Sequence, residues 1–362
     1  MARSHPPFTQ RLLELIESQG PIPIASFMAL ANSHYYATRD PLGVTGDFIT
    51  APEISQIFGE LIGLWIADLW LRAGQPRAAL VELGPGRGTL MADARRALSQ
   101  VPGMAGMPVH LVETSPALRA AQARAVPDAH WHDSVATLPV DCALLVIANE
   151  FFDALPIRQF IATAGGWRER MVTARRDGLV PVSGPMPVDP LIPPELRGRP
   201  AGSVVETSPA SAAVVEDLGA RIAAQGGCAL IIDYGYQGPA TGDTLQAVKG
   251  HRPADVFAAP GEADLTAHVD FTTLAMAASR SGCQAWGTVT QGALLRALGI
   301  AARAERLKRH NPARAQAVDA DVERLTTPGQ MGTLFKALAL TAASWPEPAG
   351  FQGQGSGGHP DE

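Results

Sequence analysis

The sequence predicts an α/β protein whose core is a Rossmann-like, doubly wound sheet, preceded by a helical segment and interrupted by inserted segments on the substrate side. From position 78 onward, apolar runs alternate with helix-compatible segments, which is typical of a mainly parallel sheet. The alternate glycines Gly84, Gly86 and Gly88 follow the first apolar run, and polar side chains follow the later ones. Ligands of such sheets bind beyond the carboxyl ends of the strands, so we expect the site there.

The first part of the chain predicts two helices and a long loop. An amphipathic pattern favours a helix over Phe8–Ser18, the run Gly20–Pro23 breaks it, and Ile24–Ala31 suits a second, short helix. A loop rich in Gly, Pro and polar residues then runs from Tyr35 to Glu53. Long loops in compact domains are often functional, but a plain surface connection is equally compatible with this composition. The residues that could cover a ligand, or only pack the N-terminal segment, are Tyr35, Tyr36, Asp47 and Glu53, with Thr50 beside them.

A helix over Ser55–Arg72 leads into the glycine turn. The strand that follows, 78–84, is apolar except for Glu82, and Thr89 can cap a helix over 89–99. A dinucleotide fingerprint needs a glycine at position 89, where this chain has Thr. The G-x-G-x-G spacing, with an acid two residues upstream, instead resembles motif I of the class I S-adenosylmethionine (SAM) methyltransferases. Three glycines are also common in a simple turn.

A second buried strand, 109–113, ends at Glu113. A carboxylate at this position of a doubly wound sheet can accept from both hydroxyl groups of a ribose. Thr114 or Ser115 is suited to cap the helix over Pro116–Ala125, and the two roles are compatible.

Two more strands end in polar residues. The third, 129–134, ends at Asp133 and Ser134, which could contact an adenine amino group or simply form a turn. The fourth, 143–148, is fully apolar and runs into Asn149–Pro156, which contains Glu150 and Asp153. Polar groups therefore follow each of the first four strands.

The alternation stops at Ile157 and resumes later. Antiparallel hairpins are indicated over Trp167–Met171 and Thr173–Val182, and the parallel pattern returns with a helix over Pro209–Ala224 and a strand over Cys228–Gly235 that contains Asp233. The remaining predictions are an irregular stretch 238–264, a helix 271–281, a strand 285–290, a helix from Leu294, a strand 331–341 and a disordered tail from Gln352.

This order suggests a division of the chain into successive segments. They are an N-terminal helical segment with a lid-like loop (1–54), the first part of the SAM-binding sheet domain (55–156), a β-rich substrate insertion (157–205), the return to the sheet (206–235), a second insertion (236–270), the last part of the sheet domain (271–345) and a tail (346–362).

Composition excludes several classes of protein. A hydrophobic content of 46% and a charged content of 18% indicate a globular protein, and scattered basic residues with a net charge of −6 argue against nucleic acid as a partner. The three cysteines form no C-x-x-C pair and have no histidines at ligand spacing, so we expect no metal site. No apolar run is long enough to span a membrane and no signal or transit peptide is evident, which favours a cytoplasmic protein. The oligomeric state stays open.

Several long motifs together resemble the MidA-like family of SAM-dependent methyltransferases, which is related to the mitochondrial complex I assembly arginine methyltransferase. The resemblance covers roughly residues 8 to 345. It implies a class I methyltransferase fold, SAM as the methyl donor and, for the mitochondrial members, dimethylation of an arginine on a core complex I subunit. The motifs are Gly46–Ser55, Val81–Leu90, Asn149–Pro156, Asp233–Tyr236, Gly261–Phe271 and Met331–Lys336.

Methyl transfer to an arginine sets requirements that a few acids could meet. The displacement is in line, so the protein must hold nucleophile and methyl group in position and exclude water. A guanidinium has a pKa above about 12, and carboxylates can orient it through paired hydrogen bonds. The catalytic candidates are Glu150, Asp153 and Asp233, with His268 and Asp270 as possible proton acceptors. Glu150 could instead cap a helix or contact the cofactor, Asp153 could cap a turn, and His268 could be a structural histidine.

The candidate SAM contacts collect at the strand ends. Three function classes are compatible with them: a protein-arginine methyltransferase acting on a complex I subunit, a small-molecule methyltransferase, and a non-catalytic SAM-binding assembly chaperone. The intact glycines and Glu113 argue against the third class, because a protein without a cofactor needs no bare backbone there. The candidate cofactor contacts are Thr50, Glu82, Gly84, Pro85, Gly86, Gly88, Glu113, Thr114, Ser115, Asp133, Ser134, Asn149 and Glu150.

Overall fold

The computed structural model describes residues 7–38, 50–176, 178–250 and 252–352, which form two compact units. The first, here the insertion unit, comprises Met1–Phe48, Asp153–Ala212 and Gln237–Asp270. The second, here the sheet unit, comprises Ile49–Phe152, Ala213–Tyr236 and Phe271–Glu362. The predicted Asp47 and the predicted disordered tail beyond Gln352 fall outside the described residues.

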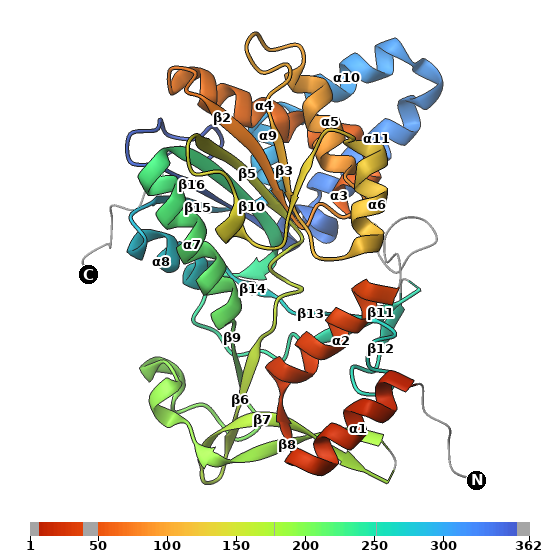
Figure 1. Ribbon diagram of the computed structural model, residues 1–362, viewed down its shortest axis with the longest axis vertical. Helices are drawn as coiled ribbons and strands as arrows, with labels where there is room; N and C mark the ends of the chain where they lie inside the picture. The colour runs from red at the N-terminus through yellow and green to blue at the C-terminus, as the bar shows by residue number, and fades with distance from the viewer. Residues whose placement is uncertain (1–6, 39–49, 177, 251, 353–362) are drawn as a thin grey trace. The chain divides into compact units, whose positions relative to one another are not determined.

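The sheet unit contains the doubly wound sheet that the sequence predicts (Figure 1). The strands β10, β5, β2, β3 and β4 pair in parallel, whereas β16 is antiparallel to both of its neighbours. Apolar runs build the central strands, and every residue of β2 and β5 is buried. In spatial order the strands are β15 (Gln284–Thr290), β16 (Phe335–Thr341), β10 (Gly227–Tyr236), β5 (Ala143–Asn149), β2 (Ala78–Leu83), β3 (Val109–Val112) and β4 (His130–His132).

The order of winding reverses between β2 and β5. From β2 the chain proceeds outward through β3 and β4, then returns to β5 on the other side of β2 and continues to β10. Leu83 lies opposite Ala148, so both strands end at the same level. In doubly wound sheets this topological switch point is where ligands bind, and the glycine turn and Asn149 both lie there.

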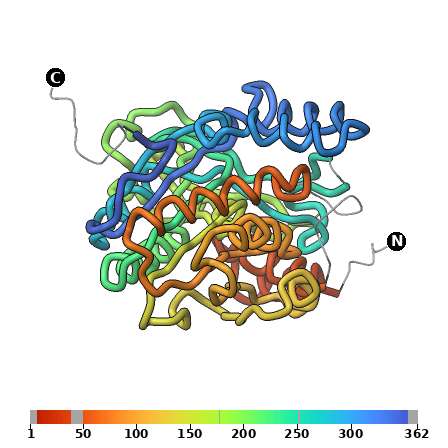
Figure 2. Tube along the Cα trace, turned by 90° about the horizontal axis from the view of Figure 1, so that it is seen from above, coloured from red at the N-terminus to blue at the C-terminus, as the bar shows by residue number. Residues whose placement is uncertain are grey.

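The helices of the sheet unit pack closely where small residues allow it. Adding a Cβ to Gly59 or Gly63 of α4 would bring it to 2.7 Å from Asp93 Cβ or 2.9 Å from Ala94 Cα, both on α5. Figure 2 shows α10, in blue, alongside α4, in orange. Arg303 Nε of α10 donates to Glu60 Oε2 of α4 at 2.7 Å. The helices are α3 (Ala51–Ile54), α4 (Gln56–Arg72), α5 (Thr89–Leu98), α6 (Pro116–Ala125), α7 (Pro209–Gln225), α8 (Phe271–Arg280), α9 (Gln291–Ala297), α10 (Ile300–His310) and α11 (Ala315–Thr326).

In its described residues, the insertion unit has two antiparallel sheets and two α-helices. One sheet runs in the order β1-β7-β6-β9 with β8 paired to β7, and the other in the order β12-β11-β13. Leu12, Phe27, Val172 and Leu265 belong to one buried cluster that joins the helices to the sheets. The elements are α1 (Pro7–Gln19), β1 (Ile22–Pro23), α2 (Ile24–Thr38), β6 (Arg158–Thr163), β7 (Gly166–Arg175), β8 (Gly178–Pro187), β9 (Val204–Thr207), β11 (Gln246–Lys249), β12 (Arg252–Ala254), β13 (Asp264–Thr266) and β14 (Val269–Asp270).

Three local predictions are wrong, each for an identifiable reason. Helix α2 extends to Thr38 rather than ending at Ala31, because the polar Asn32 is buried and its Nδ2 donates to Ala154 O at 3.1 Å and Leu265 O at 2.8 Å. Tyr35 and Tyr36 are therefore helical and do not belong to a loop. The stretch 238–264 contains β11 and β12. The last strand begins at Phe335 because a kinked turn, in which Gln330 is not helical, occupies Pro328–Gly332.

No helix among the described residues is long and apolar enough to cross a membrane.

Candidate active site

The glycine turn occupies a backbone conformation that other residues rarely adopt. Gly84, Gly86 and Gly88 have φ values of +61°, +54° and +85°. A Cβ on Gly84 would lie 2.8 Å from Phe151 Cδ2, and one on Gly88 would lie 3.3 Å from Ala125 Cβ. The turn therefore requires glycine for conformation and for space, and it leaves bare backbone at the switch point.

The predicted cap of α5 is wrong. Gly88 occupies the N-cap position and Thr89 is the first residue of the helix. Thr89 Oγ1 instead donates to Glu53 Oε1 at 2.5 Å. This bond ties α3, the described end of the predicted long loop, to the start of α5, an attachment that the sequence did not predict.

Two buried polar atoms beside the turn have no hydrogen-bond partner within the described residues. They are Glu82 Oε2 on β2 and Asn149 Oδ1 on β5. Burial raises the pKa of Glu82 to about 8, although a backbone N–H, that of Met91, donates to the carboxylate. A buried acceptor without a partner is costly unless a ligand supplies the donor or a positive charge, and SAM carries an ammonium and a sulfonium group. These atoms and the glycine turn fit SAM.

Glu113 lies at the end of β3 with both carboxylate oxygens held. Oε1 accepts from the Ser115 N–H at 2.7 Å, and Oε2 accepts from Gln122 Nε2 at 3.3 Å. Burial raises its pKa above the ordinary value, while the N–H groups of Ser115 and Thr114 act in the opposite direction. Ser115 Oγ accepts from the Leu118 N–H at 3.4 Å, so one of the two predicted caps of α6 is confirmed.

Asp133 and Ser134 follow β4 on an exposed surface. Asp133 accepts from Arg119 Nη2 at 2.6 Å, and its side chain is 83% exposed. Arg119 Nε also donates to the Glu113 carbonyl at 2.7 Å, so one guanidinium joins the ends of β3 and β4. The Ser134 carbonyl accepts from Thr137 Oγ1 at 3.0 Å.

The end of β5 has a strained backbone. Glu150 adopts a φ of +52°, which is rare for a non-glycine residue and often found at functional sites. Its Oε1 accepts from Asn149 Nδ2 at 3.1 Å and from the Ala51 N–H at 3.2 Å. Ala51 follows Thr50, so the described end of the long loop lies against the predicted site residues at the end of β5.

Asp233 is fully buried in β10 and accepts from backbone on both sides. Its Oδ2 accepts from the Phe152 N–H at 3.0 Å and its Oδ1 from the Tyr234 N–H at 2.9 Å. These bonds fix the segment that follows β5.

The remaining catalytic candidates, Asp153 and His268, belong to the insertion unit. Asp153 is 6% exposed, and its carbonyl accepts from the Ala267 N–H at 3.0 Å. The His268 N–H donates to Thr244 Oγ1 at 2.8 Å. Asp270 Oδ1 accepts from the Gly238 N–H at 3.2 Å.

Near Asp153, Asp264 was missed as a site candidate, and Tyr36 was considered only as a residue that could cover a ligand. The Tyr36 hydroxyl donates to Asp264 Oδ2 at 2.7 Å. Burial, followed by the charges of Asp264 and Asp153, raises the pKa of Tyr36 well above its usual range, so both acids lie near the phenol. Asp264 lies within the motif Gly261–Phe271, but nothing in the sequence pairs it with a tyrosine more than two hundred positions earlier.

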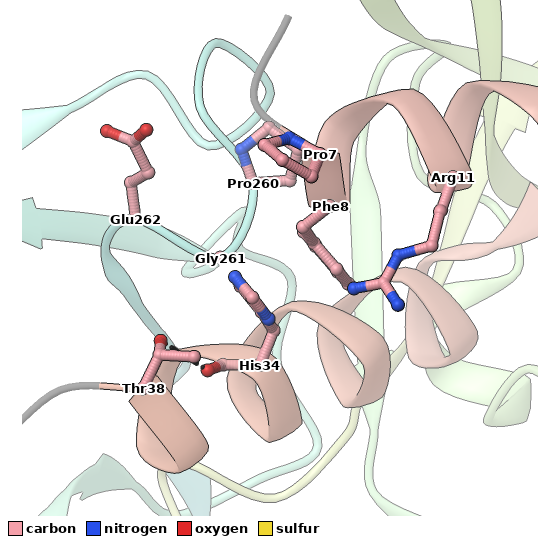
Figure 3. Close-up of a pocket in the computed structure, with 8 residues that line it drawn as sticks. All are labelled: Pro7, Phe8, Arg11, His34, Thr38, Pro260, Gly261 and Glu262. Carbon is pink, nitrogen blue, oxygen red and sulfur yellow. Dashed lines mark hydrogen bonds between the residues drawn. The ribbon is translucent and has the colours of Figure 1, made fainter.

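A separate pocket of about 290 Å³ lies in the insertion unit (Figure 3). The rings of Phe8 and His34 stack there at 4.3 Å between centroids, and a Cβ on Gly261 would lie 2.7 Å from His34 Cδ2. None of the predicted site residues lines it. The lining residues are Pro7, Phe8, Arg11, His34, Thr38, Pro260, Gly261 and Glu262.

The described residues contain no group of three or more His, Cys, Asp or Glu side chains that could hold a metal ion.

A doubly wound sheet with bare glycine backbone and unpartnered buried acceptors at its switch point fits the class I SAM-dependent methyltransferases. Residues 61–289 match the model of a protein family described as "Putative S-adenosyl-L-methionine-dependent methyltransferase". The chain belongs to this family, and the resemblance to its MidA-like members is confirmed. It is a SAM-dependent methyltransferase, and SAM is its cofactor.

Named relatives extend over most of the chain. It is 39% identical to the Drosophila melanogaster "Protein arginine methyltransferase NDUFAF7 homolog, mitochondrial", over 93% of this chain and 85% of the relative. It is 36% identical to the Homo sapiens "Protein arginine methyltransferase NDUFAF7, mitochondrial", over 92% of this chain and 83% of the relative.

A solved structure resembles the whole chain. A Burkholderia thailandensis protein, crystallised with S-adenosyl-homocysteine, aligns with a TM-score of 0.83 and 26% identity, over 98% of each chain. The predicted class I fold is confirmed by this likeness.

The prediction of a cytoplasmic location is wrong. It is contradicted by relatives at 36 to 39% identity that are named as mitochondrial proteins. The prediction rested on the lack of a recognisable leader near position 1, and such an absence does not identify a compartment.

Proposed function

We propose that this chain is a protein-arginine N-methyltransferase that methylates a core subunit of respiratory complex I during assembly. The names of the relatives support arginine as the modified residue. The complex I subunit is what the resemblance to the MidA-like family implies. The structural observation that carries the proposal is the group formed by Tyr36, Asp153 and Asp264, in which both acids are buried and the Tyr36 hydroxyl donates to Asp264 Oδ2 at 2.7 Å. Buried carboxylates near each other suit a guanidinium, which presents a planar array of donors and keeps its charge.

In this proposal the strand ends of the sheet unit hold the cofactor. SAM supplies the methyl group when it is bound. Gly84, Gly86 and Gly88 provide the bare backbone, and Glu113 accepts from the ribose hydroxyls. Glu82 and Asn149 offer their unpartnered oxygens to the cationic methionine end. Contacts from Thr50, Pro85, Thr114, Ser115, Asp133, Ser134 and Glu150 complete the set that we assign.

The acceptor is oriented by acids in the proposal. Glu150 and Asp153 bind the guanidinium, so that its charge is drawn away from the nitrogen that takes the methyl group. That nitrogen gives up one proton, and we assign His268 as the group that receives it, with Asp270 as the alternative. The Asp233 carboxylate accepts from the Phe152 N–H. It therefore contributes by fixing the backbone between Glu150 and Asp153.

The test uses labelled SAM and a mitochondrial or bacterial lysate from a strain that lacks this protein. The expected result is label on an arginine of a complex I subunit, identified by mass spectrometry. Label in a small molecule would favour the second function class. Binding of SAM without any labelled product would favour the non-catalytic class and contradict the proposal.

A further inference from the structure

One buried side chain, Gln122 of α6, joins three parts of the cofactor side of the sheet unit. It is fully buried. Its Nε2 donates to the Gly86 carbonyl at 2.7 Å and to Glu113 Oε2 at 3.3 Å. Its Oε1 accepts from Trp131 Nε1 at 2.8 Å. Both ends of the amide are therefore used, as a buried polar group requires.

The glycine turn lies directly on this part of α6. A Cβ on Gly88 would approach Gln122 Cα to 3.5 Å and Ala125 Cβ to 3.3 Å. The glycine turn and α6 are therefore in close contact, and the hydrogen bond from Gln122 to the Gly86 carbonyl joins them. This bond fixes a turn whose glycines would otherwise allow many conformations.

Glu113 is held by the same amide. The Ser115 N–H holds Oε1, and Gln122 holds Oε2. An ionised carboxylate has about four acceptor sites, so the two bonds fix its position and still leave acceptor capacity for hydroxyl groups.

We propose that Gln122 is a positioning residue for SAM, because its amide couples the glycine turn to the acid that we assign to the ribose. The inference rests on the proposed cofactor contacts of Gly86 and Glu113. An amide is needed because one group must donate to two acceptors and accept from an indole. A carboxylate in its place would face the Gly86 carbonyl and the Glu113 carboxylate with no proton to give.

The decisive variant is Gln122→Glu, which keeps the shape and the acceptor for Trp131. Calorimetric titration with S-adenosyl-homocysteine at pH 8 should show binding weakened by roughly 10- to 100-fold. Binding should recover as the pH falls toward about 5, because a protonated carboxyl group regains one donor. In turnover assays KM for SAM should rise while kcat at saturating SAM stays within about threefold of wild type, since the residue touches no reacting atom.

Two further variants control the interpretation. Trp131→Phe removes the indole donor but leaves both donors of Gln122 in place, so its affinity should stay within about threefold of wild type. Gln122→Met introduces an apolar side chain of similar volume, so it should weaken binding by about tenfold at every pH. This variant provides the test if Gln122→Glu does not fold. Thermal unfolding establishes which variants are folded.

The outcomes separate this inference from the function on which it rests. Wild-type affinity in folded Gln122→Glu and Gln122→Met, while Gly86→Val fails to bind, would refute the positioning role alone. Retained binding by Gly86→Val would contradict the cofactor assignment itself.

Discussion

The acids at the strand ends of the sheet unit and the acids of the insertion unit are held in different ways. Each of the three acids at the strand ends of the sheet unit accepts at least one backbone N–H: Ser115 donates to Glu113, Ala51 to Glu150, and Phe152 and Tyr234 to Asp233. In the insertion unit, side chains donate most of the hydrogen bonds to the acids. The pairs there are Tyr36 with Asp264, Gln159 and Thr244 with Glu206, Arg170 with Asp243, and Arg158 with Glu169.

This difference suits different ligands. Backbone donors are set by the sheet and its turns, and they do not change when side chains are substituted, so they suit a cofactor that never varies. Side-chain donors can be replaced one at a time, so they suit an acceptor that differs between enzymes. The comparison predicts that damage to the sheet unit affects SAM binding or folding, whereas damage to the insertion unit affects transfer to the acceptor.

The largest effect is expected for Gly86→Val. A β-branched residue is strained at a φ of +54°, and its side chain would occupy the space that we assign to the cofactor. Calorimetry should detect no SAM binding. The matched control is Gly106→Val, at a φ of +78° in the same unit but with open space around a Cβ, where binding should persist. Wild-type affinity in Gly86→Val would mean that the turn does not hold SAM.

Asp153→Ala and Glu150→Ala should lower transfer to the acceptor by roughly 10²- to 10⁴-fold, because each removes a group that orients the guanidinium. SAM affinity should fall much less for Asp153→Ala, which lies in the insertion unit, than for Glu150→Ala. The measurement is incorporation of labelled methyl groups into the acceptor, with calorimetry on the same samples. Asp153→Asn keeps the shape and should be almost as slow, since an amide brings no negative charge. Unchanged labelling would remove the residue from the catalytic set.

Asp233→Ala should lower the free energy of unfolding by about 2–4 kcal/mol, because it leaves the Phe152 and Tyr234 N–H groups without their acceptor inside the core. Asp233→Asn keeps one acceptor oxygen and should cost about half as much. Urea denaturation measures both. If Asp233→Asn kept wild-type stability but lost all transfer activity, Asp233 would act on the acceptor directly and not only through backbone.

The sequence predicted the sheet unit well because its signals are local. Each apolar run became a strand, and the residue at its end lies at the carboxyl-end edge of the sheet. Glu113 and Asn149 could therefore be placed at this edge without any knowledge of packing. Gln122 was missed because α6 offers only its helical pattern, and a glutamine there reads as surface. Its role depends on partners from a turn and from two strands.

The acceptor side was harder to predict for the same reason. Asn32 looked like the end of a helix, although its side chain is satisfied by Ala154 and Leu265 in distant parts of the chain. Tyr36 and Asp264 meet only through tertiary structure. Side-chain pairs of this kind leave no periodic pattern in the sequence. The motifs therefore identified the family but did not predict that Tyr36 and Asp264 lie together.

The smallest expected effect concerns Glu82. It tests whether this buried acid of the sheet unit interacts with the positive charge of SAM. Its pKa is raised from 4.5 to about 8 by burial, so the folded protein binds more protons than the unfolded chain between these values. Without ligand, the free energy of unfolding should therefore fall as the pH rises from about 4.5 through 8. A cationic ligand favours the ionised form, so SAM affinity should rise by up to about tenfold between pH 6 and 8.5, with release of a proton. Calorimetry in buffers of different ionisation enthalpy measures that proton. Glu82→Gln should bind more weakly and lose the pH dependence, whereas a wild-type pH profile in this variant would assign the titration to another group.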